Sequence, residues 1–82
     1  MKEQEIIVKI NEVLADEFEI DIDIITPDAL LMETLELDSL DLVDVVVLIE
    51  SNFGVTLKGP DFIGIKTFSD FYNLISTKVN EK

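Results

Sequence analysis

Hydrophobic side chains recur at helical spacing in three stretches of the chain, at residues 3–18, 39–53 and 68–79. In each stretch the apolar residues gather on one side of a helical wheel, which predicts an amphipathic helix with a buried face. The residues of the three predicted faces are Ile6, Ile10, Val13 and Leu14, then Leu42, Val45, Val46, Ile49 and Phe53, and finally Phe68, Phe71, Tyr72, Ile75 and Val79.

The ends of these helices carry recognisable capping residues. Asp38 is a good N-cap for the second helix, and Asp41 three residues later can return the hydrogen bond as in a capping box. Thr67 and Asp70 form the same pair before the third helix. Gly54 is a natural stop for the second helix, because glycine adopts the left-handed conformation without steric cost.

The stretch between the first two helices, residues 19–38, has no helical period. Its first six residues alternate like a strand, but no second strand pattern is available to pair with them, so we expect a long loop. Such a loop must be held onto the core, and the leucines at 30, 31 and 35 are the candidates.

A shorter helical turn is predicted at Pro60–Gly64, between two breaks in the chain. The fold class is therefore all-α. We expect a small four-helix bundle of three main helices and one short helix, with a long first loop. The length predicts a single domain over residues 1–82.

Charge narrows the range of partners. The chain has 18 acidic and 6 basic residues, a net charge of −12, and no basic residue between Lys9 and Lys58. This excess argues against nucleic acid and against an anionic membrane surface as partners, since both attract Lys and Arg. A protein partner with a basic surface is expected instead.

Histidine and cysteine are both absent, which removes His-assisted nucleophiles and Cys/His zinc sites. We therefore expect no enzyme activity and no metal site. Asp21 and Asp23 begin like a calcium loop, but Met32 stands where that loop requires Glu. The longest apolar stretch is too short to span a membrane, and the acidic N-terminus is unlike a signal peptide. These features predict a cytoplasmic protein.

Ser39 is the candidate functional residue at the start of the second helix. If Asp38 caps the second helix, Ser39 is its first residue, exposed beside unpaired backbone amides where the helix dipole favours a phosphate group. An ordinary helix start without further function remains the alternative, because Asp-Ser is common there.

The second helix also has an apolar ridge that cannot share its core face. On the wheel, Leu40, Val43 and Val47 lie away from the core residues and are flanked by acids. These acids are Asp41, Asp44 and Glu50. The pattern predicts a docking face for an apolar and basic partner surface, unless other elements cover the ridge.

With Leu35 before the Asp38-Ser39-Leu40 motif and Phe53-Gly54 after the second helix, the chain resembles the acyl carrier proteins over nearly its whole length. The resemblance implies that Ser39, flanked by Asp38 and Leu40, is esterified with 4′-phosphopantetheine by a holo-carrier-protein synthase. It implies that the arm's thiol carries acyl groups as thioesters, in fatty acid or polyketide-type synthesis. It also implies a cavity between the helices that shelters a short acyl chain.

The expected partners are this phosphopantetheinyl transferase and acyl-transfer enzymes with basic docking patches, and the carrier itself is expected to be a monomer. The chain departs from the family at Glu36, where a glycine is usual, and in the acids late in the second helix, of which only Glu50 remains. The alternative function is an acidic helical adaptor that binds a basic protein without modification.

Overall fold

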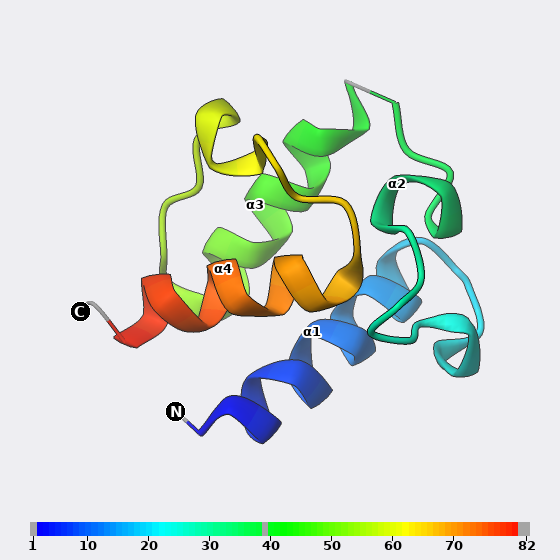
Figure 1. Ribbon diagram of the computed structural model, residues 1–82, viewed down its shortest axis with the longest axis horizontal. Coiled ribbons are helices and arrows are strands. Elements are labelled where there is room, and N and C mark those ends of the chain that lie inside the picture. Colours follow the sequence, from blue (N-terminus) through cyan, green and yellow to red (C-terminus); the bar gives the residue numbers. More distant parts are fainter. Residues whose placement is uncertain (1, 39, 81–82) are drawn as a thin grey trace.

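A computed structural model describes residues 2–38 and 40–80 of the chain (Figure 1). Three long helices form the body, and the predicted all-α bundle is confirmed. In chain order the elements are α1 (Glu3–Glu17), the 3₁₀ turn η1 (Ile22–Ile24), α2 (Leu31–Thr34), α3 (Asp41–Phe53), the 3₁₀ turn η2 (Gly59–Phe62) and α4 (Phe68–Asn80).

The core is built from the apolar faces of the three long helices. Its fully or nearly buried residues are Ile6, Ile10, Leu14, Ile25, Leu31, Leu35, Val45, Ile49, Val55, Leu57, Phe68, Phe71, Tyr72 and Ile75. Val46, Phe53 and Val79 pack against this core while partly exposed. Val13 and Leu42 were predicted to be core residues but are only half-buried. Val13 lies at the edge of the apolar face of α1, and Leu42 lies in the first turn of α3, at the end of the helix.

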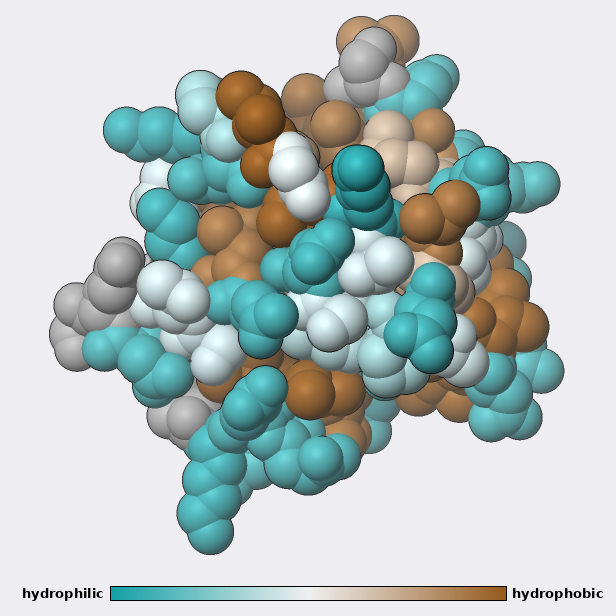
Figure 2. All heavy atoms as spheres, in the orientation of Figure 1, coloured by the Kyte–Doolittle hydropathy of each residue, from teal (hydrophilic) through white to brown (hydrophobic). Residues whose placement is uncertain are grey.

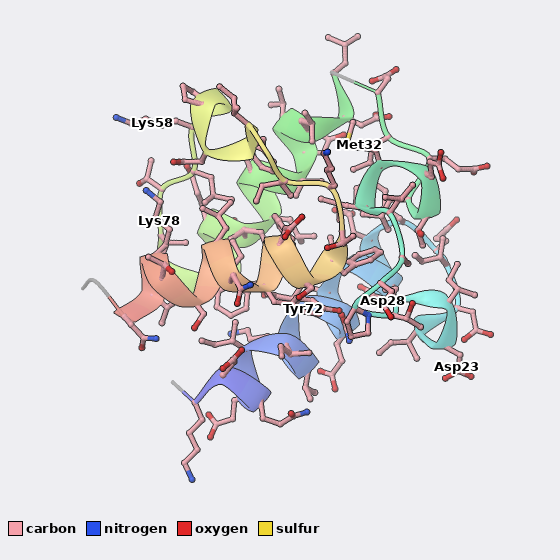
Figure 3. All side chains as sticks on the ribbon, in the orientation of Figure 1. Asp23, Asp28, Met32, Lys58, Tyr72 and Lys78 are labelled. Carbon is pink, nitrogen blue, oxygen red and sulfur yellow. The ribbon has the colours of Figure 1, made fainter. Side chains whose placement is uncertain are left out.

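Two polar contacts join α1 to the other long helices. The Tyr72 hydroxyl of α4 donates a hydrogen bond to Asn11 Oδ1 of α1, and Figure 3 shows Tyr72 in the space between these helices. Burial raises the pKa of the Tyr72 phenol, while the bond to Asn11 acts in the opposite direction. Lys9 Nζ donates to the Asn52 carbonyl of α3 over 2.8 Å and lies 5.1 Å from the centre of the Phe53 ring. Lys9 thus places a positive charge at the C-terminal end of α3, where it is favourable.

The segment between α1 and α3 is more ordered than the predicted loop, since it contains η1 and α2. Leu31 and Leu35 are buried and anchor it, as expected. Leu30 is 43% exposed, so its predicted anchoring role is wrong. Leu30 has an extended backbone, in which successive side chains point to opposite sides, so Leu31 faces the core and Leu30 faces solvent.

Backbone hydrogen bonds hold this segment against the start of α4. Leu31 N donates to the Lys66 carbonyl at 2.9 Å, and Phe68 N donates to the Ala29 carbonyl at 3.1 Å. These bonds surround an isolated antiparallel bridge between Leu30 and Thr67. The contact fixes α2, and with it the chain that leads into α3.

The short helix predicted at Pro60–Gly64 is present as η2, which begins one residue earlier and ends two residues earlier than expected. Phe62 stacks against Phe71 of α4 with ring centroids 6.2 Å apart. Asp61 accepts from the Lys58 backbone N–H at 2.9 Å and pairs with Lys78 of α4 at 3.6 Å. Figure 3 shows Lys78 directed toward η2 while Lys58 extends into solvent.

Candidate functional site

The start of α3 is organised by two aspartates. Asp38 Oδ1 accepts hydrogen bonds from the backbone N–H of Leu40 (2.9 Å) and of Asp41 (3.0 Å). Asp41 Oδ2 in turn accepts from the Asp38 backbone N–H at 3.2 Å. The predicted capping box is confirmed, although the regular helix begins at Asp41, two residues later than expected.

Ser39 itself lies outside the described residues, so its predicted exposure at the first helical position stays a prediction. Both of its neighbours in the chain are open to solvent: Asp38 is exposed, and Leu40 has 78% of its surface exposed. The prediction of unpaired amides beside Ser39 is wrong for Leu40 and Asp41, because Asp38 already accepts from both N–H groups. An anion at the start of α3 would be stabilised by the helix dipole and not by hydrogen bonds from the Leu40 and Asp41 N–H groups.

The apolar ridge of α3 is exposed as the helical wheel predicted. Val43 is 61% exposed and Val47 is 55% exposed, whereas Val45 and Ile49 on the opposite side are completely buried. Figure 2 shows apolar side chains reaching the surface at the upper edge, near the start of α3 in Figure 1. Leu40, Val43 and Val47 therefore form an apolar surface, called the α3 ridge below.

The acids beside the α3 ridge differ in their accessibility. Asp44 is exposed, while Asp41 and Glu50 are half-buried. Asp41 is also part of the capping box, so one of its carboxylate oxygens is already bound to the backbone. Asp44 is therefore the most solvent-exposed of these three acidic residues.

The turn that leads from α2 toward Ser39 contains an uncommon backbone conformation that the sequence reasoning did not predict. Glu36 has φ = 53°, in the left-handed region. The Leu37 N–H donates to the Met32 carbonyl at 2.9 Å, the hydrogen bond that closes a Schellman motif. Glycine is the favoured residue at this position of the motif. The only sequence signal was therefore the glycine that the related family usually has there.

Other acidic and apolar features lie apart from the start of α3. Asp21 accepts from the Asp23 N–H at 2.9 Å and caps η1. Within residues 2–38 and 40–80, no group of three or more acidic side chains is arranged to hold a metal ion. A shallow apolar hollow of about 490 Å³ lies on α1, between Glu5 and Val13. None of the helices described is long and apolar enough to cross a membrane.

Comparison with known proteins identifies the family that the chain resembles. A family model described as "Phosphopantetheine attachment site" matches residues 8–75. The chain is 39% identical to the acyl carrier protein of Petrotoga mobilis over 80 residues, which covers 98% of this chain and 94% of that protein. It is 38% identical to the acyl carrier protein of Lactobacillus acidophilus, over 94% of this chain and 96% of that protein. The acyl carrier protein of Thermotoga maritima is 36% identical, over 93% and 94%.

Proposed function

The chain belongs to the acyl carrier proteins, and on that premise we propose that Ser39 receives the 4′-phosphopantetheine arm. A member of this family is a carrier rather than a catalyst. It interacts with a phosphopantetheinyl transferase and with enzymes that handle acyl groups. When bound, the arm supplies a thiol that holds acyl groups as thioesters. The carrier needs an accessible attachment residue on a stable helix and a surface that partners bind briefly.

The capping box is the observation that carries the proposal. Ser39 stands between Asp38 and Leu40, two exposed residues joined by a hydrogen bond from the Leu40 N–H to the Asp38 carboxylate. Asp38 and Asp41 hold the start of α3 through two hydrogen bonds in which the Ser39 side chain takes no part. A serine at such a place can be modified without loss of the fold, and the helix dipole favours the phosphate of the arm.

The α3 ridge and Asp44 supply the docking face for partner enzymes. Apolar contact with Leu40, Val43 and Val47 gives area, and the exposed Asp44 carboxylate attracts a basic surface. Asp41 and Glu50 are half-buried and contribute to the same negative field with less direct access. This combination favours fast and reversible association, which a carrier that visits several enzymes requires.

The cellular role that fits best is fatty acid synthesis, with polyketide-type synthesis as the related alternative. The proposal includes a single acyl-carrier domain over residues 1–82, a monomer in the cytoplasm, and a short acyl chain sheltered among the helices. These parts are supported by the family membership, through the match over residues 8–75.

The test is loading of purified protein with coenzyme A, magnesium and a broad-specificity phosphopantetheinyl transferase, followed by intact-mass and peptide mass spectrometry. We expect one arm on Ser39 of the unchanged chain and none on Ser39→Ala. Circular dichroism of Ser39→Ala should show an unchanged helix content and melting temperature, because Asp38 is the cap. Ser51→Ala, on the exposed side of α3, is the matched control and should load normally. Failure of the unchanged chain to load would favour the unmodified acidic adaptor instead.

A further inference from the structure

Glu36 is held rigidly although it is exposed. The residues on either side of it are turned inward: Leu35 is buried and Leu37 is partly buried against the core. The Glu36 N–H donates to the Glu33 carbonyl at 3.2 Å, and the Leu37 N–H donates to the Met32 carbonyl at 2.9 Å. The backbone is thus fixed on both sides, and the Glu36 side chain can extend only into solvent.

The conformation of Glu36 is unfavourable for a residue with a side chain. Its φ of 53° lies in the left-handed region, where a non-glycine residue costs stability. Among the described residues the Glu36 carboxylate has no hydrogen-bond or ion-pair partner, so its charge does not offset that cost. A strained residue with an unused charge next to a modification motif suggests a function outside the fold.

Backbone strain alone does not indicate a function for Glu36, because Glu19 has the same conformation. Glu19 has φ = 54° and ends α1 with the same type of hydrogen bond, from the Ile20 N–H to the Ala15 carbonyl at 3.1 Å. The two glutamates differ in place. Glu36 is three residues before Ser39, and only Leu37 separates it from the capping Asp38.

We propose that Glu36 is a specificity-determining residue for the enzyme that loads Ser39, with its carboxylate paired to a basic side chain of that enzyme. The inference rests on the proposed function of Ser39. The fixed turn presents the Glu36 charge on the approach to α3, so a transferase that reaches Ser39 meets this charge. Because hydrogen bonds already hold the backbone at Glu36 and Leu37, the pairing needs little further ordering of the turn at the moment of binding.

The experiment measures the second-order rate constant of loading by a bacterial acyl-carrier-protein synthase with coenzyme A and magnesium, at low salt and at 0.5 M NaCl. Glu36→Gln removes the charge and keeps the side-chain size, and Glu36→Lys reverses the charge. We expect Glu36→Gln to lower the rate constant about two- to fivefold at low salt, as for loss of one exposed ion pair, and Glu36→Lys to lower it further. Both losses should shrink at 0.5 M NaCl.

Glu19→Gln and Glu19→Lys are the matched controls, since they change net charge equally at the same backbone conformation. They should load like the unchanged chain. Glu36→Gly and Glu19→Gly should both raise the melting temperature, but only Glu36→Gly should slow loading, which separates recognition from stability. Equal rates for all Glu36 variants, or an equal loss for Glu19→Lys, would overturn the proposal. A chain that is not loaded on Ser39 at all would instead overturn the proposed function, and this inference with it.

Discussion

At the scale of single residues, Asp70 shows how one carboxylate orders a helix start. Its Oδ2 atom accepts from the backbone N–H of Lys66 at 3.1 Å and of Thr67 at 3.3 Å, while its own N–H donates to Thr67 Oγ1 at 3.3 Å. The backbone hydrogen bonds from Lys66 and Thr67 lower the pKa of the Asp70 carboxyl below its ordinary value of 3.8. The ionised form therefore contributes to stability through these bonds.

The lowered pKa of Asp70 gives a prediction with a definite sign. Since the folded-state pKa is below the unfolded one, the contribution is complete above the unfolded pKa and is lost as pH falls through the folded pKa. Asp70→Asn should melt at a lower temperature than the unchanged chain at pH 6, and this difference should narrow as the pH falls from 5 to 2.5. Thermal unfolding followed by circular dichroism measures it. Asp28→Asn, at an exposed position, is the control for the loss of one negative charge and should melt like the unchanged chain at pH 6.

At the scale of elements, the long helices and the short turn at η2 could be predicted, while η1 and α2 could not. α1, α3 and α4 repeat their apolar residues over three or more turns, and the capping pairs Asp38–Asp41 and Thr67–Asp70 are local in sequence. α2 has only four residues, too few for a period to appear. Its position depends on the hydrogen bond from Leu31 to Lys66, a residue 35 positions later in the chain.

In the candidate site, too, some features could be predicted from the sequence and others could not. Exposure of Leu40, Val43 and Val47 follows from the wheel of α3, because the core face of that helix is fixed by Val45 and Ile49. The left-handed turn at Glu36 could not be predicted from residue preferences, since glutamate disfavours that conformation. It exists because the burial of Leu31 and Leu35 and the packing of Leu37 determine the path of the backbone between them.

Two valines of α3 test whether the α3 ridge is a surface or part of the core. Val45→Ala should reduce the free energy of unfolding by about 2–3 kcal/mol, since it removes two fully buried methyl groups and leaves a cavity. Val47→Ala should change it by no more than about 0.5 kcal/mol, because Val47 is 55% exposed and alanine has the higher helix propensity. Urea unfolding measures both values.

Loading kinetics on the same two variants complete this test. Val47→Ala should slow loading by the synthase through lost apolar contact, with a weaker dependence on salt than a change of charge would have. Val45→Ala should load normally at temperatures where it is folded. If Val47→Ala is as unstable as Val45→Ala, the α3 ridge belongs to the core and cannot be the docking face.

At the scale of the whole molecule, negative charge is distributed with little local compensation. Of the described residues, Lys78 and Asp61 form an ion pair at 3.6 Å, and Lys9 bonds to a carbonyl rather than to a carboxylate. The described part of the chain measures 30 × 25 × 21 Å. At 10 mM salt the screening length is about 30 Å, so charges repel one another across the entire molecule.

The net charge of −12 therefore predicts that salt stabilises the fold. Raising NaCl from 10 mM to 0.5 M shortens the screening length to a few ångströms and removes most of the repulsion, which is stronger in the compact state than in the extended unfolded chain. For a domain of this size, a gain of about 1 kcal/mol in the free energy of unfolding corresponds to a rise of roughly 4–8 °C in melting temperature. Differential scanning calorimetry measures the shift.

A variant with Glu12→Gln, Asp16→Asn and Glu17→Gln loses three exposed negative charges of α1, so it should be more stable at 10 mM NaCl and gain less from added salt. Equal salt gains in the two proteins would mean that the repulsion arises elsewhere, and no gain in either would contradict the prediction.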